Sequence, residues 1–259
     1  MVLNGLPFAR VGSRFNAASG GIDARITKSL DLTARYEMSW AAFDRVDQGV
    51  QLTGGVVHGV RSSLRHHFTE RASAGGEYGI RWADLNDGAR QFTYQDVGGV
   101  VQYRTGEDTV VEGAGGLSYL IDRRFDVSRT SPYVRAAVKH RTSRASVGAD
   151  YRRSYAPSFF LGGSHLAQEV GGYVDMPLNR NRTYVQGMVA WRRADPVLLG
   201  ETALKTLWLR EAVGYKLQRW LRIEGYHLYM NQNNRLAGGN ITRQMIGAQV
   251  IVSEPVRIR

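Results

Sequence analysis

The sequence predicts an all-β fold, namely a single antiparallel up-and-down transmembrane β-barrel with 14 strands, or with 12 as the alternative. Three observations predict it. Apolar and polar residues alternate with a period of two over long stretches. Short polar turns recur roughly every 35–40 residues, the spacing of two strands and a loop. No stretch approaches the ~18–20 consecutive apolar residues of a membrane helix. No break in composition divides the 259 residues, so we expect one barrel domain over residues 1–259.

The alternation defines the individual strands. In residues 32–42, large apolar side chains such as Tyr36 and Trp40 alternate with polar ones such as Arg35. Such a pattern places the two kinds of side chain on opposite faces of a strand. The faces of residues 204–230 are left unassigned because the pattern is weaker there. The same alternation is clear in residues 50–61, 71–82 and 143–152.

Six polar turns pair these strands into hairpins and predict twelve strands. Residues 241–252 add a thirteenth, and residues around 6–17 can supply a fourteenth, so that strands extend from about residue 6 to residue 252. The chain ends without a terminal aromatic residue, so we expect a short tail over residues 253–259. The turns are expected at 29–31, 65–67, 105–107, 142, 179–181 and 218–219, and longer loops at 43–48, 83–91, 122–131, 154–165, 193–202 and 231–240.

Alternation alone fits a soluble sandwich as well as a membrane barrel, but three features favour the barrel. The strands are longer than the ~5–6 residues usual in soluble sheets. Charges of both signs occur in mid-strand on the polar face, where they can pair across a water-filled lumen. Aromatic residues gather near strand ends, as at the two interfaces of a membrane. One belt comprises Phe68, Tyr103 and Tyr215 near the tight turns, and the other Trp40, Trp82, Tyr119 and Trp191 near the long loops.

This pattern, over nearly the whole chain, resembles the Gram-negative outer-membrane β-barrels. It is similar in particular to the β-barrel porins associated with exopolysaccharide loci. The resemblance implies a location in the outer membrane, with short periplasmic turns and longer extracellular loops. It also implies contact with outer-membrane lipid and lipopolysaccharide, insertion by the barrel-assembly machinery, and a possible periplasmic or envelope partner.

The chain is strongly basic, with 34 Lys and Arg against 23 Asp and Glu. Only four of the 34 are lysines, so 30 are arginines. They alternate with apolar residues along the whole chain and share faces with carboxylates. This distribution argues against a nucleic-acid-binding groove. We expect the lumen to be lined by Arg25, Arg35, Glu37, Arg61, Arg71, Glu77, Arg81, Glu112, Arg135, Arg144, Asp150, Arg152, Asp175 and Arg192.

Two readings of this lumen stay open. The arginines and carboxylates can form a ladder of ion pairs that stiffens the wall, as in a non-conducting barrel that anchors a partner. Alternatively, the excess of arginine can make a conduit that passes or guides small anionic solutes or polysaccharide. Pairs of glycines inside the strands are expected to face one another across hairpins, where they allow the sheet to bend or a partner to approach closely. The expected partners are Gly54-Gly55 with Gly75-Gly76, and Gly98-Gly99 with Gly115-Gly116.

The sequence indicates no enzyme. Ser164-His165 lies in an expected loop, without a recognisable third residue or oxyanion site. His66-His67 lies in an expected turn and is not read as a metal site. The chain has no cysteine, which excludes a thiolate metal site or nucleophile. We therefore expect no catalytic residue, no metal and no cofactor.

Overall fold

The computed structural model describes residues 13–43, 53–86, 88–159, 162–179, 182–198, 203–218, 220–234 and 239–252. Thirteen β-strands make up this part of the chain. None of its residues forms a helix of the length and apolarity that a membrane crossing requires. The strands are β1 (Ser13–Thr27), β2 (Leu30–Phe43), β3 (Gly55–His67), β4 (Ala72–Leu85), β5 (Arg90–Arg104), β6 (Thr109–Asp122), β7 (Val127–Arg141), β8 (Ser146–Ser158), β9 (Gly163–Leu178), β10 (Thr183–Pro196), β11 (Leu204–Lys216), β12 (Leu221–Asn234) and β13 (Gly239–Val252).

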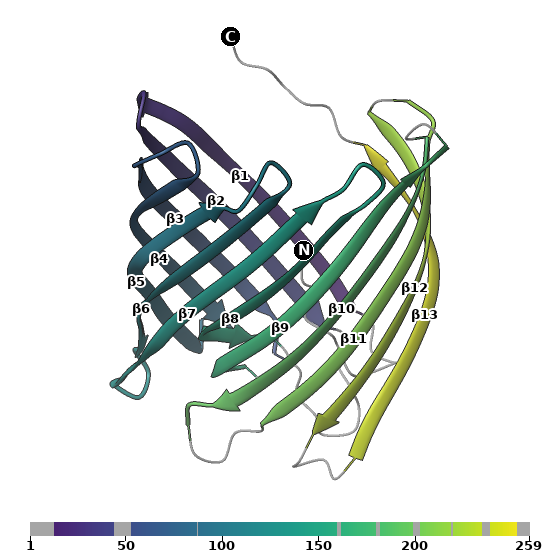
Figure 1. Cartoon of the computed structure of the whole chain (residues 1–259). Coiled ribbons are helices and arrows are strands. Elements are labelled where there is room, and N and C mark those ends of the chain that lie inside the picture. Colours follow the sequence, from purple (N-terminus) through teal and green to yellow (C-terminus); the bar gives the residue numbers. More distant parts are fainter. Residues whose placement is uncertain are drawn as a thin grey trace.

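The strands form one antiparallel meander in which each pairs with the next along the sequence. The sheet curls into a tilted, barrel-like wall, with β1 and β13 as its two edge strands (Figure 1). Even the shortest strands have 13 residues. At ~3.3 Å per residue such a strand is about 43 Å long, enough to cross a ~30 Å hydrocarbon core at a tilt of about 45°. The all-β meander expected from the sequence is confirmed.

The described residues contain thirteen strands rather than the 14 or 12 expected. Residues 13–17, assigned to a separate strand over 6–17, form the start of β1 instead. The reason is a continuous ladder: β1 pairs with β2 from Ser13 opposite Phe43 to Thr27 opposite Leu30, with one irregularity between Arg25 and Thr27. Residues 6–12 and the expected tail lie outside the described part. β13 ends at Val252, where the last strand was expected to end.

Three of the six connections expected to be long are short, and the loops expected at 43–48, 193–202 and 231–240 lie partly outside the described residues. The connections at 86–89, 123–126 and 159–162 are as short as the turns at the other end, although longer loops were expected at 83–91, 122–131 and 154–165. Two causes account for this. The strand ladders continue to pairs such as Leu85 opposite Arg90. The chain then reverses tightly through residues with positive φ, such as Asn86 at 57° and Gly162 at 66°.

The two faces of the sheet differ in the way that a membrane barrel requires. Side chains on the outer face include many large apolar groups that are exposed, whereas most of the arginines and carboxylates in the strands lie on the inner face. Polar residues on the concave side and apolar residues toward lipid are the inverse of a soluble sandwich. The exposed outer residues include Val60, Leu64, Tyr78, Val97, Val101, Leu117, Val134, Val170, Val189, Leu207, Val213, Ile246 and Val250.

The end of β8 leaves the wall and lies across the inner face. β8 pairs with β7 only as far as Arg153 opposite Val134, and its remaining residues pair with β9 alone. Phe159, just beyond β8, packs edge-on against Phe15 of β1, with ring centroids 6.5 Å apart. Tyr155 and Phe159 belong to a buried apolar cluster on the concave side of the sheet, together with Ala41, Val57, Ala83, Leu85, Phe92, Tyr94 and Leu120.

Candidate functional site on the inner wall

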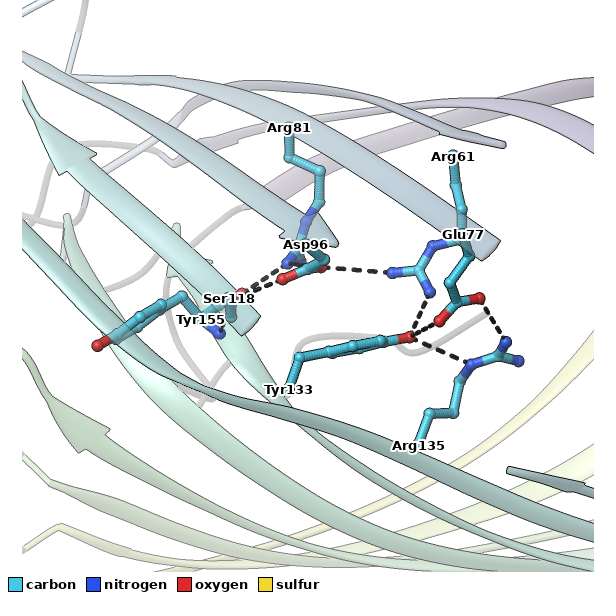
Figure 2. Close-up of polar contacts among 8 residues, drawn as sticks. All are labelled: Arg61, Glu77, Arg81, Asp96, Ser118, Tyr133, Arg135 and Tyr155. Carbon is cyan, nitrogen blue, oxygen red and sulfur yellow. Dashed lines mark hydrogen bonds and ion pairs between the residues drawn. The ribbon is translucent and has the colours of Figure 1, made fainter. Parts of the chain in front are cut away.

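A polar network on the inner face is centred on Tyr133 of β7 (Figure 2). Its hydroxyl donates to Glu77 Oε1 at 2.6 Å and accepts from Arg61 Nη1 at 2.9 Å. Arg135 donates to Glu77 Oε2 at 2.8 Å and to Glu112 Oε1 at 2.5 Å. The Glu77 side chain is only 4% exposed. A carboxylate buried this deeply needs charged or hydrogen-bonding partners, and the network supplies both.

Asp96 of β5 holds the second half of the network (Figure 2). Arg81 and Arg61 reach its Oδ2 at 3.2 and 3.5 Å, and Ser118 donates to its Oδ1 at 2.5 Å. Arg81 also donates to the backbone oxygen of Tyr155 at 2.7 Å. Arg61 contacts both halves, so the network is continuous, and it is tied to the end of β8.

These contacts establish which face is inside. Arg61 lies on β3 and Tyr133 on β7, four strands away. At ~4.8 Å between strands, the path along the sheet between them is about 19 Å. Their side chains nevertheless meet at 2.9 Å, which only the concave side of a strongly curved sheet allows. The network therefore crosses the interior and narrows it.

Glycines on neighbouring strands make room for these arginines. Gly59 lies opposite Arg81 and Gly79 lies opposite Arg61, both in the β3–β4 ladder. A Cβ at Gly59 would lie 3.0 Å from Arg81 Cγ, and one at Gly79 would lie 3.6 Å from Arg61 Nε. Glycine at these positions lets a long side chain lie flat along the wall.

The glycine pairs behave as expected in one hairpin: Gly98 faces Gly116, and Gly99 faces Gly115. In the β3–β4 hairpin the same expectation is wrong. Gly75 lies opposite Arg65, because the turn occupies residues 68–71 rather than 65–67. The displaced turn shifts the register, so that the glycines at 54–55 and 75–76 do not meet.

A cavity of about 550 Å³ remains on the inner side, between β1–β4 and β8–β10. Arg81, Arg152 and Arg192 line it together with Glu37 and Glu169. Arg152 forms an ion pair with Glu169 at 3.8 Å. The remaining wall is apolar or carries small polar groups: Phe15, Ala17, Ala18, Ser19, Met38, Ser39, Val57, Gly59, Ser154, Ala156, Pro157, Phe159 and Ala167.

A separate inward cluster lies on β10–β13, and it includes residues of the 204–230 stretch whose faces the sequence left unassigned. Glu224 accepts from Tyr184 at 2.9 Å and from Gln249 at 2.7 Å, and it pairs with Arg210. Sequence reasoning missed this cluster, as it missed Asp96, Tyr133 and Glu169. A signal was available at Asp96, since it alternates with the outward Val97 and Val101. A signal was also available at Tyr133, because it lies two residues before Arg135 on the same strand and therefore shares the inward face expected for Arg135.

The structure brings together part of the expected lumen lining. Arg61, Glu77, Arg81, Glu112 and Arg135 join the central network, whereas Glu37, Arg152 and Arg192 line the cavity. The other strand residues make local contacts or stand apart: Arg35 pairs with Asp23 at 2.5 Å, Arg25 pairs with Asp31 at 3.3 Å, Asp175 accepts from Gln186 at 2.9 Å, and Asp150 lies beside Gly171.

Arg71 and Arg144 were expected to lie in strands and to line the lumen, but neither of them lies in a strand. Arg71 lies in the β3–β4 connection and Arg144 in the β7–β8 connection, and both are exposed. The hydroxyl groups of Thr69 and Thr142 cap these turns by accepting from the backbone N–H groups of Arg71 and Arg144, each at 3.2 Å. Local turn chemistry thus interrupts the alternation at these two positions.

The expected belt residues lie at the exposed surface, with one exception. Trp40 is only half-exposed on β2. Aromatic side chains at the outer surface of a barrel suit the polar-to-apolar boundary of a membrane. The exposed members are Phe68, Trp82, Tyr103, Tyr119, Trp191 and Tyr215.

The described residues contain no group of three or more acidic or histidine side chains arranged to hold a metal ion. Ser164 and His165, noted in the sequence, are buried at the start of β9 rather than in a loop.

Comparison with known proteins gives structural likenesses only. No protein-family model matches the chain, and no curated protein matches it. The ferric-catecholate import receptor Fiu of E. coli K12 is 9% identical, with a TM-score of 0.46, and the match covers 86% of this chain and 46% of that one. This chain thus spans about half the length of that receptor.

Two further solved structures are described as outer-membrane proteins. Wzi of Escherichia coli, a carbohydrate-binding β-barrel involved in group 1 capsule assembly, is 11% identical, with a TM-score of 0.46 over 88% of this chain and 62% of that one. A loop-deletion mutant of OmpT of Vibrio cholerae is 11% identical, with a TM-score of 0.43 over 92% of this chain and 96% of that one. The membrane-barrel assignment itself rests on the apolar outer face and the polar inner face described above.

Proposed function

We propose that the protein is a porin-like channel of the Gram-negative outer membrane, whose arginine-rich lumen passes small anionic solutes. The observation that carries the proposal is the cavity of about 550 Å³ on the inner face, with three arginines and two glutamates on its wall. Arginine keeps its charge at any physiological pH, so the surplus cation attracts anions permanently. The proposal includes no catalytic activity.

The cross-barrel contacts favour small solutes over a polymer. The Tyr133 network and the end of β8 both cross the interior, so they narrow the path beside the cavity. The resemblance to exopolysaccharide-associated porins keeps polysaccharide as a further candidate solute, for which these contacts would have to open. The outer face then lies against lipid and lipopolysaccharide after insertion by the barrel-assembly machinery.

A second candidate function follows from the same contacts. The apolar cluster that includes Tyr155 and Phe159 fills part of the interior. If this filling is complete, the protein is a non-conducting barrel that anchors an envelope partner.

Single-channel current in a planar bilayer under a KCl gradient separates the two functions. We expect steady conductance with an anion-selective reversal potential. Arg152→Glu should lower that selectivity, because Arg152 lines the cavity. Arg144→Glu makes the same charge change in an exposed turn and should have a smaller effect. Insertion without current would contradict the channel and favour the anchoring barrel.

A further inference from the structure

The cavity between β1–β4 and β8–β10 has two chemically different walls. Arginines from three strands form one: Arg81 of β4, Arg152 of β8 and Arg192 of β10. Phe15, Phe159 and other apolar side chains form the other. A concave site in which an apolar wall faces a few convergent polar groups is typical of a small-molecule site.

Register places the charges of the polar wall in a row. Glu169 of β9 lies between Arg152 and Arg192, opposite the first in the β8–β9 ladder and opposite the second in the β9–β10 ladder. Counted over the whole lining, three arginines face two glutamates, Glu37 and Glu169, so the wall carries one positive charge in surplus. A bound anion can compensate that charge, and a carboxylate fits a guanidinium with two parallel hydrogen bonds.

Two of these arginines, Arg81 and Arg152, differ in how firmly they are already held. Arg81 pairs with Asp96 and donates to the backbone of Tyr155, and its side chain is 26% exposed. The Arg152 side chain is 47% exposed, and its contact with Glu169 is long, at 3.8 Å. Arg152 is therefore the better placed to meet a ligand.

The apolar wall is built from rings and small residues. Phe159 is 4% exposed and meets Phe15 edge to face. Small residues, including Ala17, Ala156 and Ala167, leave the space in front of these rings open. An apolar or aromatic body fits such a surface, and edge-to-face contact with it would add to the burial of apolar area.

We propose that this cavity binds a monocarboxylate with an aromatic or compact alkyl body. The carboxylate pairs with Arg152 beside Glu169, and the body packs against Phe15 and Phe159. This inference rests on the proposed channel function and names its solute class. The volume of about 550 Å³ lies within the range of small-molecule pockets.

Titration calorimetry of the detergent-folded protein tests the site, with benzoate as the probe. Acetate has the carboxylate of benzoate but no aromatic ring, and benzyl alcohol has the ring but no negative charge. Each should bind at least about tenfold more weakly than benzoate, since each lacks the group that contacts one of the two walls. Arg152→Gln and Phe159→Leu should weaken benzoate binding by a similar factor. Arg144→Gln should leave it unchanged, and each variant is first checked for folding by heat-dependent mobility in gels.

The outcomes separate this inference from the channel function. Equal binding of acetate and benzoate, or tighter binding of glucuronate than of benzoate, would overturn the apolar body. Unchanged benzoate binding in a folded Arg152→Gln variant would overturn the assigned site. Anion-selective current without benzoate binding would refute the solute class and leave the channel. Benzoate binding without current would support the site and refute the channel.

Discussion

Replacing Tyr133 by phenylalanine removes one hydroxyl from the centre of the inner network. That hydroxyl donates to Glu77 at 2.6 Å and accepts from Arg61 at 2.9 Å and from Arg135 at 3.3 Å. The ring stays, so no cavity is created. We expect the free energy of unfolding to fall, because Glu77 loses a donor that water cannot easily replace.

The size of this loss in stability depends on which other hydrogen bonds and ion pairs each partner of the hydroxyl retains. Arg61 retains Asp96, and Arg135 retains Glu77 and Glu112. Only the bond to the buried Glu77 is therefore counted in full. A hydrogen bond to a charged group contributes about 1.5–3 kcal/mol, so we expect a loss of about 2–3 kcal/mol.

Urea unfolding of the protein in phospholipid vesicles, followed by tryptophan fluorescence, measures this loss. Tyr119→Phe is the matched control, because Tyr119 lies on the outer face. It should change stability by less than about 0.5 kcal/mol, as surface substitutions usually do. A double-mutant cycle with Glu77→Gln should give a coupling energy of at least about 1 kcal/mol between the two positions. A loss at Tyr133 no larger than at Tyr119 would refute the cross-barrel network.

Three further predictions test the faces, the strand packing and the crossing segment. Val97→Lys places a charge at the middle of β5 on the outer face and should lower the free energy of unfolding in vesicles by about 2–4 kcal/mol. Ala137→Lys, on the inner face, should lower it by less than half of that. Equal losses would contradict the assignment of the faces. At Gly116 a Cβ would lie 2.0 Å from a backbone oxygen, so Gly116→Ala should lower stability by about 1–3 kcal/mol, while Gly225→Ala, with nothing within 4 Å, should not. Phe159→Ala should raise the single-channel conductance and lower stability by about 3 kcal/mol; an unchanged conductance would mean that the crossing segment does not limit the current.

Much of the wall was predictable from the sequence because the face on which a side chain lies depends only on the position of its residue within the strand. A period of two assigns Val97 outward and Glu77 inward without reference to any other strand. Turn residues were harder. Arg71 and Arg144 continue the alternation in sequence, yet the Thr69 and Thr142 hydroxyls bond to the backbone there and form turns. Hydrogen-bonded turn chemistry competes with the strand ladder, and periodicity does not reveal which one prevails.

The sequence by itself determined the all-β class, the outer and inner faces of most strands, and the surplus of arginine on the inner face. These properties follow from the alternating geometry of a strand and from composition. The tertiary structure alone decided which inward groups meet. Tyr133 reaches Glu77 from three strands away, and the end of β8 crosses to Phe15 of β1, because the sheet is curved and β8 separates from β7 after Arg153. Curvature and ladder length depend on the pairing of all the strands together, so no single segment of the sequence encodes the cavity.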